Sequence, residues 1–107
     1  MKLPEDVLIP REELTAYLLV SRAKNDKSGF LAQAGFTQQN PDMLEAAIIR
    51  FIRDNDAVQN RKDEYGTYYR VTGTLQGPNG DLNVITVWIY GAKESKYRFI
   101  TLKPDKE

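Results

Sequence analysis

The sequence predicts an α+β fold in which N-terminal helices pack on one face of a four-stranded antiparallel meander sheet. Before residue 57 apolar side chains recur at helical spacing, whereas from Ala57 onward they alternate with a period of two. Turn-forming residues separate the alternating runs. Helices followed by strands are the order typical of α+β proteins. A chain of 107 residues is expected to form one domain, residues 1–107.

The first expected helix follows Pro10 in the stretch PREELTAYLL. Proline suits the first turn of a helix, and the acidic residues after it interact favourably with the helix dipole. We expect Leu14, Tyr17 and Leu18 to form the buried stripe of this helix.

A brief second helix is expected through Phe30 and Leu31, with Asn25 or Asp26 as its cap and Gly35 at its end. A third helix is predicted because its apolar residues follow the full i, i+3, i+4, i+7, i+8 pattern. It starts at Asn40-Pro41. Its predicted core residues are Leu44, Ala47, Ile48, Phe51 and Ile52.

Four strands are expected at residues 57–63, 67–76, 82–90 and 97–103. The loop GPNG suits a three-residue hairpin that places Gly77 opposite Asp81. This register pairs Thr72 with Thr86 and Arg70 with Trp88. If GAKESK is the whole of the last loop, the remaining pairs are Tyr90 with Tyr97, Trp88 with Phe99, Thr86 with Thr101, and Val84 with Lys103.

This register gives the sheet two different faces. The face expected under the helices carries Val71, Leu75, Ile85, Val87, Ile89, Ile100 and Leu102. Tyr69 and Arg98 fall on the same side. The other face is expected to carry Arg70, Trp88, Phe99, Thr72, Thr86, Thr101, Tyr68, Tyr90, Tyr97 and Lys103. Such a surface is either ordinary strand composition, an interface, or a platform for single-stranded nucleic acid, on which bases stack and phosphates meet cations.

Composition excludes several kinds of chemistry. The chain has no cysteine and no histidine, which rules out disulfides, thiolate nucleophiles and Ser-His-Asp triads. Fifteen basic and fifteen acidic residues balance, so the net charge gives no support for nonspecific binding to nucleic acid. No metal site and no cofactor are expected. The N-terminus lacks the features of a signal peptide and no run is long enough to cross a membrane, so we expect a cytoplasmic protein without a membrane partner.

The stretch NDKS is a further candidate site. Lys27 and Ser28 lie near an expected helix start, where backbone amides favour a phosphate group; a simple capped turn explains the same residues.

Taken in order, LPEDVLIP, LTAYLL, NDKSGFLAQAGF, YGTYYRVTGTL, GPNG, ITVWIY and YRFITLKP resemble a bacterial family of uncharacterised domains. Its members are short, often cyanobacterial proteins and C-terminal domains of polymorphic toxins. The toxin relatives are similar in layout to the barnase, EndoU, colicin and RelE group of ribonuclease folds. The resemblance points to Lys27, Ser28, Tyr69, Thr86, Trp88, Arg98 and Thr101. Because the chain lacks histidine, members of that group that use histidine as acid and base cannot serve as models for it. Members that act through Arg, Lys and Tyr still can.

Two functions are therefore kept open. The first is a metal-independent endoribonuclease acting on single-stranded RNA, whose 2′-hydroxyl is the nucleophile. Its candidate catalytic residues are Lys27, Arg70, Thr86 and Thr101, and its candidate substrate-binding residues are Ser28, Trp88, Phe99 and Lys103. The second is a non-catalytic protein-binding module of a toxin/antitoxin-like or regulatory operon, whose partner is a cognate protein or a second copy of the chain.

Overall fold

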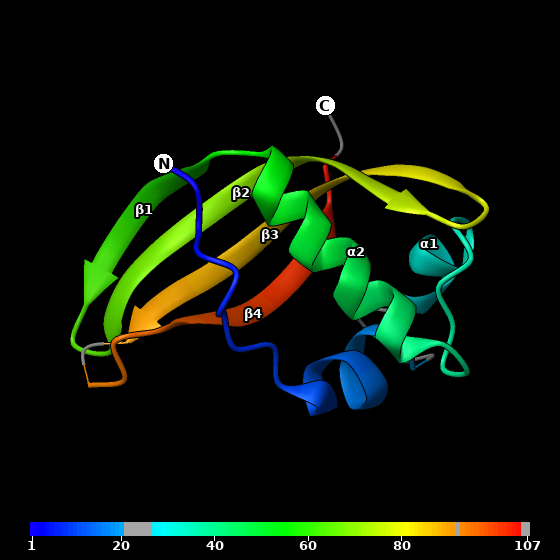
Figure 1. Cartoon of the computed structure of the whole chain (residues 1–107). Coiled ribbons are helices and arrows are strands. Elements are labelled where there is room, and N and C mark those ends of the chain that lie inside the picture. Colours follow the sequence, from blue (N-terminus) through cyan, green and yellow to red (C-terminus); the bar gives the residue numbers. More distant parts are fainter. Residues whose placement is uncertain (21–26, 92, 106–107) are drawn as a thin grey trace.

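The computed structural model describes residues 1–20, 27–91 and 93–105 (Figure 1). A π-helical segment, η1, and two α-helices precede four strands. The elements are η1 (Glu13–Leu18), α1 (Ser28–Ala32), α2 (Pro41–Asp54), β1 (Ala57–Asp63), β2 (Gly66–Gly77), β3 (Gly80–Gly91) and β4 (Tyr97–Pro104). All four strands begin and end within three residues of the predicted bounds.

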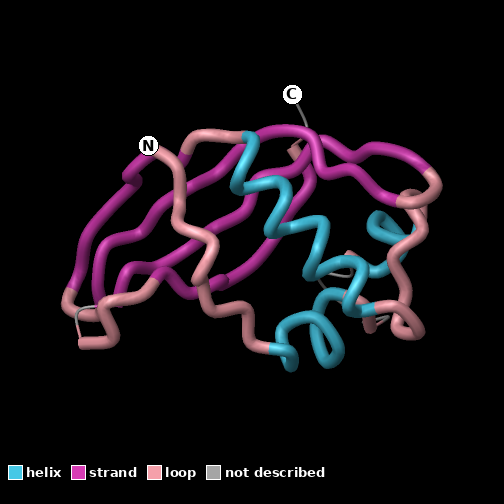
Figure 2. The backbone as a smooth tube through the Cα atoms, viewed as in Figure 1, coloured by secondary structure: helices cyan, strands magenta, loops and turns pink. Residues whose placement is uncertain are grey.

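The strands form one antiparallel sheet in the order β1-β2-β3-β4, which confirms the predicted meander. Helix α2 and the N-terminal segment lie on the same side of this sheet (Figure 1). The hairpin of β2 and β3 extends beyond the other strands toward α1 (Figure 2). Among the described residues, no helix is both long and apolar enough to span a membrane.

Helix α2 supplies most of the helical half of the core. All five residues predicted to face the core are buried: Leu44, Ala47, Ile48, Phe51 and Ile52. Pro41 occupies the first turn, as expected. The side chain of Asn40 accepts a hydrogen bond from the Thr37 amide at 2.7 Å and donates one to the Gly35 carbonyl at 2.9 Å. These bonds tie the start of the helix to the preceding corner.

The first helical segment differs from the prediction in its winding. Its hydrogen bond from the Leu19 amide to the Leu14 carbonyl spans five residues, which is the π-helical spacing. The wider turn returns Leu19, rather than Tyr17, to the face of Leu14. Leu14, Leu18 and Leu19 are therefore buried, whereas Tyr17 is exposed, and its predicted place in the stripe is wrong.

Helix α1 is short and ends at a corner that receives the tip of the β2-β3 hairpin. Gly35 has φ of +94°, a conformation that favours glycine, and the neighbouring Ala34 carbonyl accepts the Asn79 amide at 2.9 Å. The predicted cap residues, Asn25 and Asp26, lie outside the described residues.

The N-terminal segment crosses the helix-bearing side of the sheet from one edge strand to the other. The Met1 carbonyl accepts the amide of Ala57 in β1 at 2.6 Å. At the other edge, Leu8 forms a parallel bridge with Arg98, and its amide donates to the Tyr97 carbonyl at 2.8 Å. Leu3, between these contacts, is buried in the core.

The predicted register of the β2-β3 hairpin is wrong by one residue. Gly77 pairs with Gly80, so the loop contains two residues instead of three. Thr72 accordingly faces Ile85 rather than Thr86. Because successive side chains of a strand point to opposite faces, this single step exchanges the two faces of β3 relative to the prediction.

The register of β3 and β4 agrees with the prediction at one end only. Tyr90 pairs with Tyr97 and Trp88 with Phe99, as predicted. Beyond them the register shifts between Val87 and Trp88, which is the mark of a β-bulge. The observed pairs past the bulge are Val87 with Thr101, Thr86 with Leu102, Ile85 with Lys103, and Val84 with Pro104, so the predicted pairs of Thr86 and Val84 are wrong.

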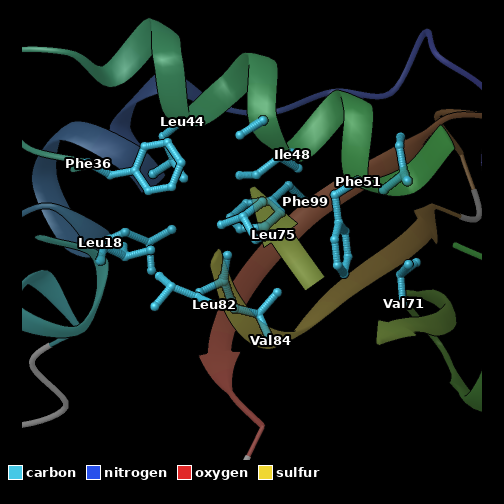
Figure 3. Close-up of a cluster of buried hydrophobic side chains, with 14 of the residues drawn as sticks. Leu18, Phe36, Leu44, Ile48, Phe51, Val71, Leu75, Leu82, Val84 and Phe99 are labelled. Atoms are coloured by element: carbon cyan, nitrogen blue, oxygen red, sulfur yellow. The ribbon is translucent and has the colours of Figure 1, made fainter. Parts of the chain in front are cut away.

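The core therefore forms against the tryptophan side of β3. The buried sheet residues are Ala57, Val71, Leu75, Leu82, Val84, Thr86, Trp88, Phe99 and Leu102. Their side chains meet those of α2 and Phe36 in a single cluster (Figure 3). Val71, Leu75 and Leu102 were predicted correctly, whereas Ile85, Val87 and Ile89 lie on the other face.

Candidate functional site

Three of the predicted site residues belong to the core. Thr86 and Trp88 have no exposed surface and Phe99 has 2%. The rings of Trp88 and Phe99 meet edge to face, with centroids 5.3 Å apart and planes at 76°. Because these rings are covered, they cannot stack on a nucleotide base, and their expected place on an exposed platform is wrong.

A short hydrogen-bond chain offsets the free-energy cost of burying the polar indole N–H of Trp88. The indole Nε1 donates to the Thr86 hydroxyl oxygen at 2.8 Å, and the Thr86 hydroxyl donates to the Val71 carbonyl at 3.2 Å. Buried polar groups cost free energy unless they find partners, and every member of this chain has one. Thr86 is thus a structural partner of Trp88.

The surface available for function is the opposite side of the sheet, which we call the open face. The strand pairing gives these positions: Val58 in β1; Tyr68, Arg70 and Thr72 in β2; Ile85, Val87 and Ile89 in β3; Arg98, Thr101 and Lys103 in β4. Arg61 of β1 joins them through its contact with the Tyr68 ring. Within residues 1–20, 27–91 and 93–105, the helices gather on the other side (Figure 1). Arg70, Thr101 and Lys103 are the predicted site residues that lie here as expected.

An aliphatic stripe runs along the middle of the open face. We use this name for Ile85, Val87 and Ile89, which occupy alternate positions of β3 and remain partly exposed. Val58 at the β1 edge is 67% exposed. A contiguous apolar row on the sheet face away from the core is a candidate contact surface.

Each residue of the stripe has a cationic neighbour on an adjacent strand. The rows across β2, β3 and β4 are Thr72-Ile85-Lys103, Arg70-Val87-Thr101 and Tyr68-Ile89-Arg98. Among the described residues, neither Arg70 nor Lys103 forms an ion pair, whereas Arg98 lies 3.6 Å from Glu94. Sequence reasoning placed Arg98 under the helices; it is exposed on the open face because of the shifted register.

Arg61 and Tyr68 form a second feature of the open face near the β1 edge. The guanidinium carbon lies 3.9 Å from the centroid of the Tyr68 ring, a cation-π arrangement. Arg61 also donates to Asp63 at 2.9 Å. Desolvation opposes ionisation of Asp63, but hydrogen bonds from the Tyr65 amide, Arg61 and Tyr68 outweigh it and lower the pKa of this carboxyl.

Lys27 and Thr101 meet although they are 74 residues apart. The Lys27 ammonium donates to the Thr101 hydroxyl at 2.9 Å, in a partly buried contact. Thr101 shares its row with Arg70, two strands away, which corresponds to about 10 Å between their backbones. Ser28 follows as the first residue of α1 and is half-buried. Three of the four predicted catalytic residues are thus near one row, and the fourth, Thr86, is not.

A tyrosine cluster lies at the other end of the helix-bearing side. Tyr97 is edge to face with Tyr69 at 5.3 Å and with Tyr90 at 4.7 Å between ring centroids. Burial, then the neighbouring Tyr69 hydroxyl, raises the pKa of Tyr97. Tyr69 lies on the covered side, as predicted. The expected open-face positions of Tyr90 and Tyr97 are wrong.

A hollow of about 470 Å³ lies between α2 and the tip of the β2-β3 hairpin. Met43 and Arg50 line it on the helix side, and Pro78 and Asp81 line it on the hairpin side. None of the residues predicted to form a site reaches it. In the described part of the chain, no group of three or more acidic side chains is arranged to hold a metal ion.

Comparison with curated proteins and with solved structures finds no significant match to this chain. A family model does match, over residues 2–106, and its description is "Domain of unknown function (DUF6883)". Because the match spans nearly the whole chain, the protein belongs to the DUF6883 family of domains of unknown function.

Proposed function

We propose that this protein is a non-catalytic protein-binding module that uses its open face as the contact surface. The observation that carries the proposal is the aliphatic stripe of Ile85, Val87 and Ile89 on the side of the sheet away from α2. A sheet face that contacts solvent can be polar without loss of stability. Fold stability therefore does not explain why this face carries a continuous aliphatic row. Covering that row by a partner supplies one, because burial of apolar surface favours association.

The composition of the rest of the face supports the same function. Arginine and tyrosine are enriched at protein interfaces, and Arg70 and Tyr68 lie beside the stripe. The aromatic rings that could have bound RNA bases, Trp88 and Phe99, are buried instead. This combination favours a protein over a single-stranded nucleic acid as the ligand of the open face.

Site-specific photocrosslinking in the cells that naturally produce the protein tests the proposal. Benzoylphenylalanine replaces Val87 in one variant and Ala46, an exposed residue of α2, in a matched control. We expect a discrete protein adduct from position 87 and none from position 46. The purified partner should then bind the unmodified chain, and Val87→Asp should weaken its affinity by at least about tenfold, whereas Ala46→Asp should not. Equal crosslinking from both positions would refute the proposal.

A metal-independent endoribonuclease is the second candidate, and the Lys27-Thr101 contact favours it. The Lys27 ammonium and the Arg70 guanidinium could both contact a phosphate lying along the Arg70-Val87-Thr101 row. In such a reaction the 2′-hydroxyl of RNA attacks phosphorus and loses its proton, and the bond to the 5′-oxygen breaks as that oxygen gains one. The fixed cations would stabilise the negative charge that develops on the phosphoryl oxygens.

Purified protein incubated with single-stranded RNA in EDTA tests this second candidate. Cleavage should leave 2′,3′-cyclic phosphate ends, and Lys27→Met should lower the rate by about 10²–10³-fold, the effect of removing one fixed donor elsewhere. Lys93→Met, in the exposed β3-β4 loop, is the matched control. Absence of cleavage, or equal rates for the two variants, would exclude the role of Lys27.

A further inference from the structure

The charges in the three central rows of the open face are of one sign. Each of its three central rows contains one cation, Lys103, Arg70 or Arg98, and none contains an acidic residue. The cations alternate between the two strands that flank the stripe, since Arg70 belongs to β2 and the other two to β4. A partner that covers the stripe must therefore also meet positive charge on both sides of it.

Within the described part of the chain, little of this positive charge is neutralised. Glu94 lies 3.6 Å from Arg98 in a largely exposed contact, and exposed pairs of this kind contribute little. Among the described residues, Arg70 and Lys103 lack an acidic side chain within ion-pair distance. The surface is complementary to acidic groups, and such complementarity determines which partners are accepted.

The shape of the stripe narrows the partner further. From Ile85 to Ile89 it is about 14 Å long, and it is one strand wide because the flanking strands, about 5 Å away, present hydroxyls and cations. A second sheet would need apolar residues on several strands. A helix with apolar residues at i, i+4 and i+8 presents a single ridge about 12 Å long, which matches the stripe.

Resting on the proposed function, we infer that the open face binds an acidic amphipathic helix of a partner protein. Its apolar ridge lies along Ile85, Val87 and Ile89, and Asp or Glu residues on both sides of the ridge meet Arg70 and Lys103. A second copy of this chain is a poorer occupant, since two open faces would bring cations against cations, and like charges in an interface are unfavourable.

A helical display library tests this inference with defined probes. A helical scaffold carries randomised surface positions at which Asp, Glu, Lys, Arg, Leu and Ile are equally frequent, and it is selected against the full chain. Each selected binder is then measured against Val87→Asp and against the double variant Arg70→Glu with Lys103→Glu. We expect most binders to depend on Val87 and to carry an excess of Asp and Glu.

Exchanging the charges of the open face and of the binder gives a more specific test within the same experiment. The Arg70→Glu and Lys103→Glu double variant should weaken an acidic binder by at least about tenfold, and a binder whose acids are changed to Lys should regain affinity for that variant. Thermal melting of each variant checks that it remains folded.

The outcomes separate the two proposals. If no binder depends on Val87, the proposed function fails. If binders depend on Val87 but are neutral or basic, the function stands and the inference of an acidic helix is overturned. A wild-type dimer in sedimentation that Val87→Asp dissociates, or a single-stranded uridine oligonucleotide that binds with the same dependence on Val87 and Arg70, would also overturn it.

Discussion

The two sides of strand β3 are both apolar, yet only one is covered. Val84, Thr86 and Trp88 are buried against α2, whereas Ile85 and Val87, between them, remain partly exposed. Hydrophobicity alone therefore does not determine which side of a strand becomes the core. The covered side carries the large ring of Trp88, and Thr86 supplies the hydrogen-bond acceptor that the buried indole N–H requires. The aliphatic stripe on the other side stays partly exposed.

The largest expected effect is the loss of stability when a side chain on the covered side of β3 is truncated, compared with truncation on the open side. Trp88→Ala should lower the free energy of unfolding by about 3–5 kcal/mol, because it leaves a cavity in a packed core. Ile89→Ala, one position along on the other side, should cost less than about 2 kcal/mol, since that side chain already contacts water. Urea denaturation followed by circular dichroism measures both. Equal losses would mean that the two sides are similarly buried.

Removing the hydroxyl that supports Trp88 should have the next largest effect. Thr86→Val leaves the indole N–H buried without an acceptor, which costs about 1–3 kcal/mol. Thr86→Ser keeps the hydroxyl and should cost less, about the value of one buried methyl group, near 0.8 kcal/mol. Chemical denaturation gives the order of the two variants. A valine variant as stable as the wild type would show that the hydrogen-bond chain does not matter.

A matched pair of valines gives a smaller but cleaner comparison. Val84→Thr places a hydroxyl in the core and should cost about 1–3 kcal/mol. Val87→Thr makes the same chemical change on the open face and should cost less than about 1 kcal/mol, since threonine suits an exposed strand position. Differential scanning calorimetry of the two variants measures the difference. A larger loss at Val87 would reverse the assignment of the faces.

The smallest expected effect is the pH dependence that Tyr97 contributes. Its folded-state pKa is raised by burial and by Tyr69, so the stability that it contributes is complete below about pH 10, the ordinary pKa of tyrosine, and is lost as the pH rises further. Tyr97→Phe should therefore narrow the gap in melting temperature between about pH 8 and pH 11. If the difference in melting temperature between the two pH values is unchanged, other groups cause the loss of stability at alkaline pH.

Much of the fold could be predicted from the sequence, because its periodicities are regular. The i, i+3, i+4 pattern from Leu44 to Ile52 located α2, and the alternating runs located all four strands. The family resemblance likewise led to an uncharacterised family, which the match over residues 2–106 confirms. The ribonuclease analogy and the toxin relationship remain predictions.

The faces of the sheet could not be assigned from the segment VITVWIY alone, because both of its sides are apolar. The deciding signal lies at the start of β3, where Asp81 and Asn83 continue the side of Ile85 and Leu82 continues the side of Trp88. Reading the whole strand would have shown that the tryptophan side is the more continuous one. The two-residue loop after Gly77 and the bulge opposite Val87 depend on this packing, so local turn preferences did not reveal them.

Thiol labelling of two single-cysteine variants tests the central claim, that β3 turns its tryptophan side to the core and its aliphatic stripe outward. The chain has no cysteine, so Val84→Cys and Val87→Cys each introduce a single reporter. Under native conditions the thiol at position 87 should react at least about tenfold faster than the one at position 84, which becomes accessible only when the protein opens. Equal rates, or faster labelling at position 84, would contradict the account.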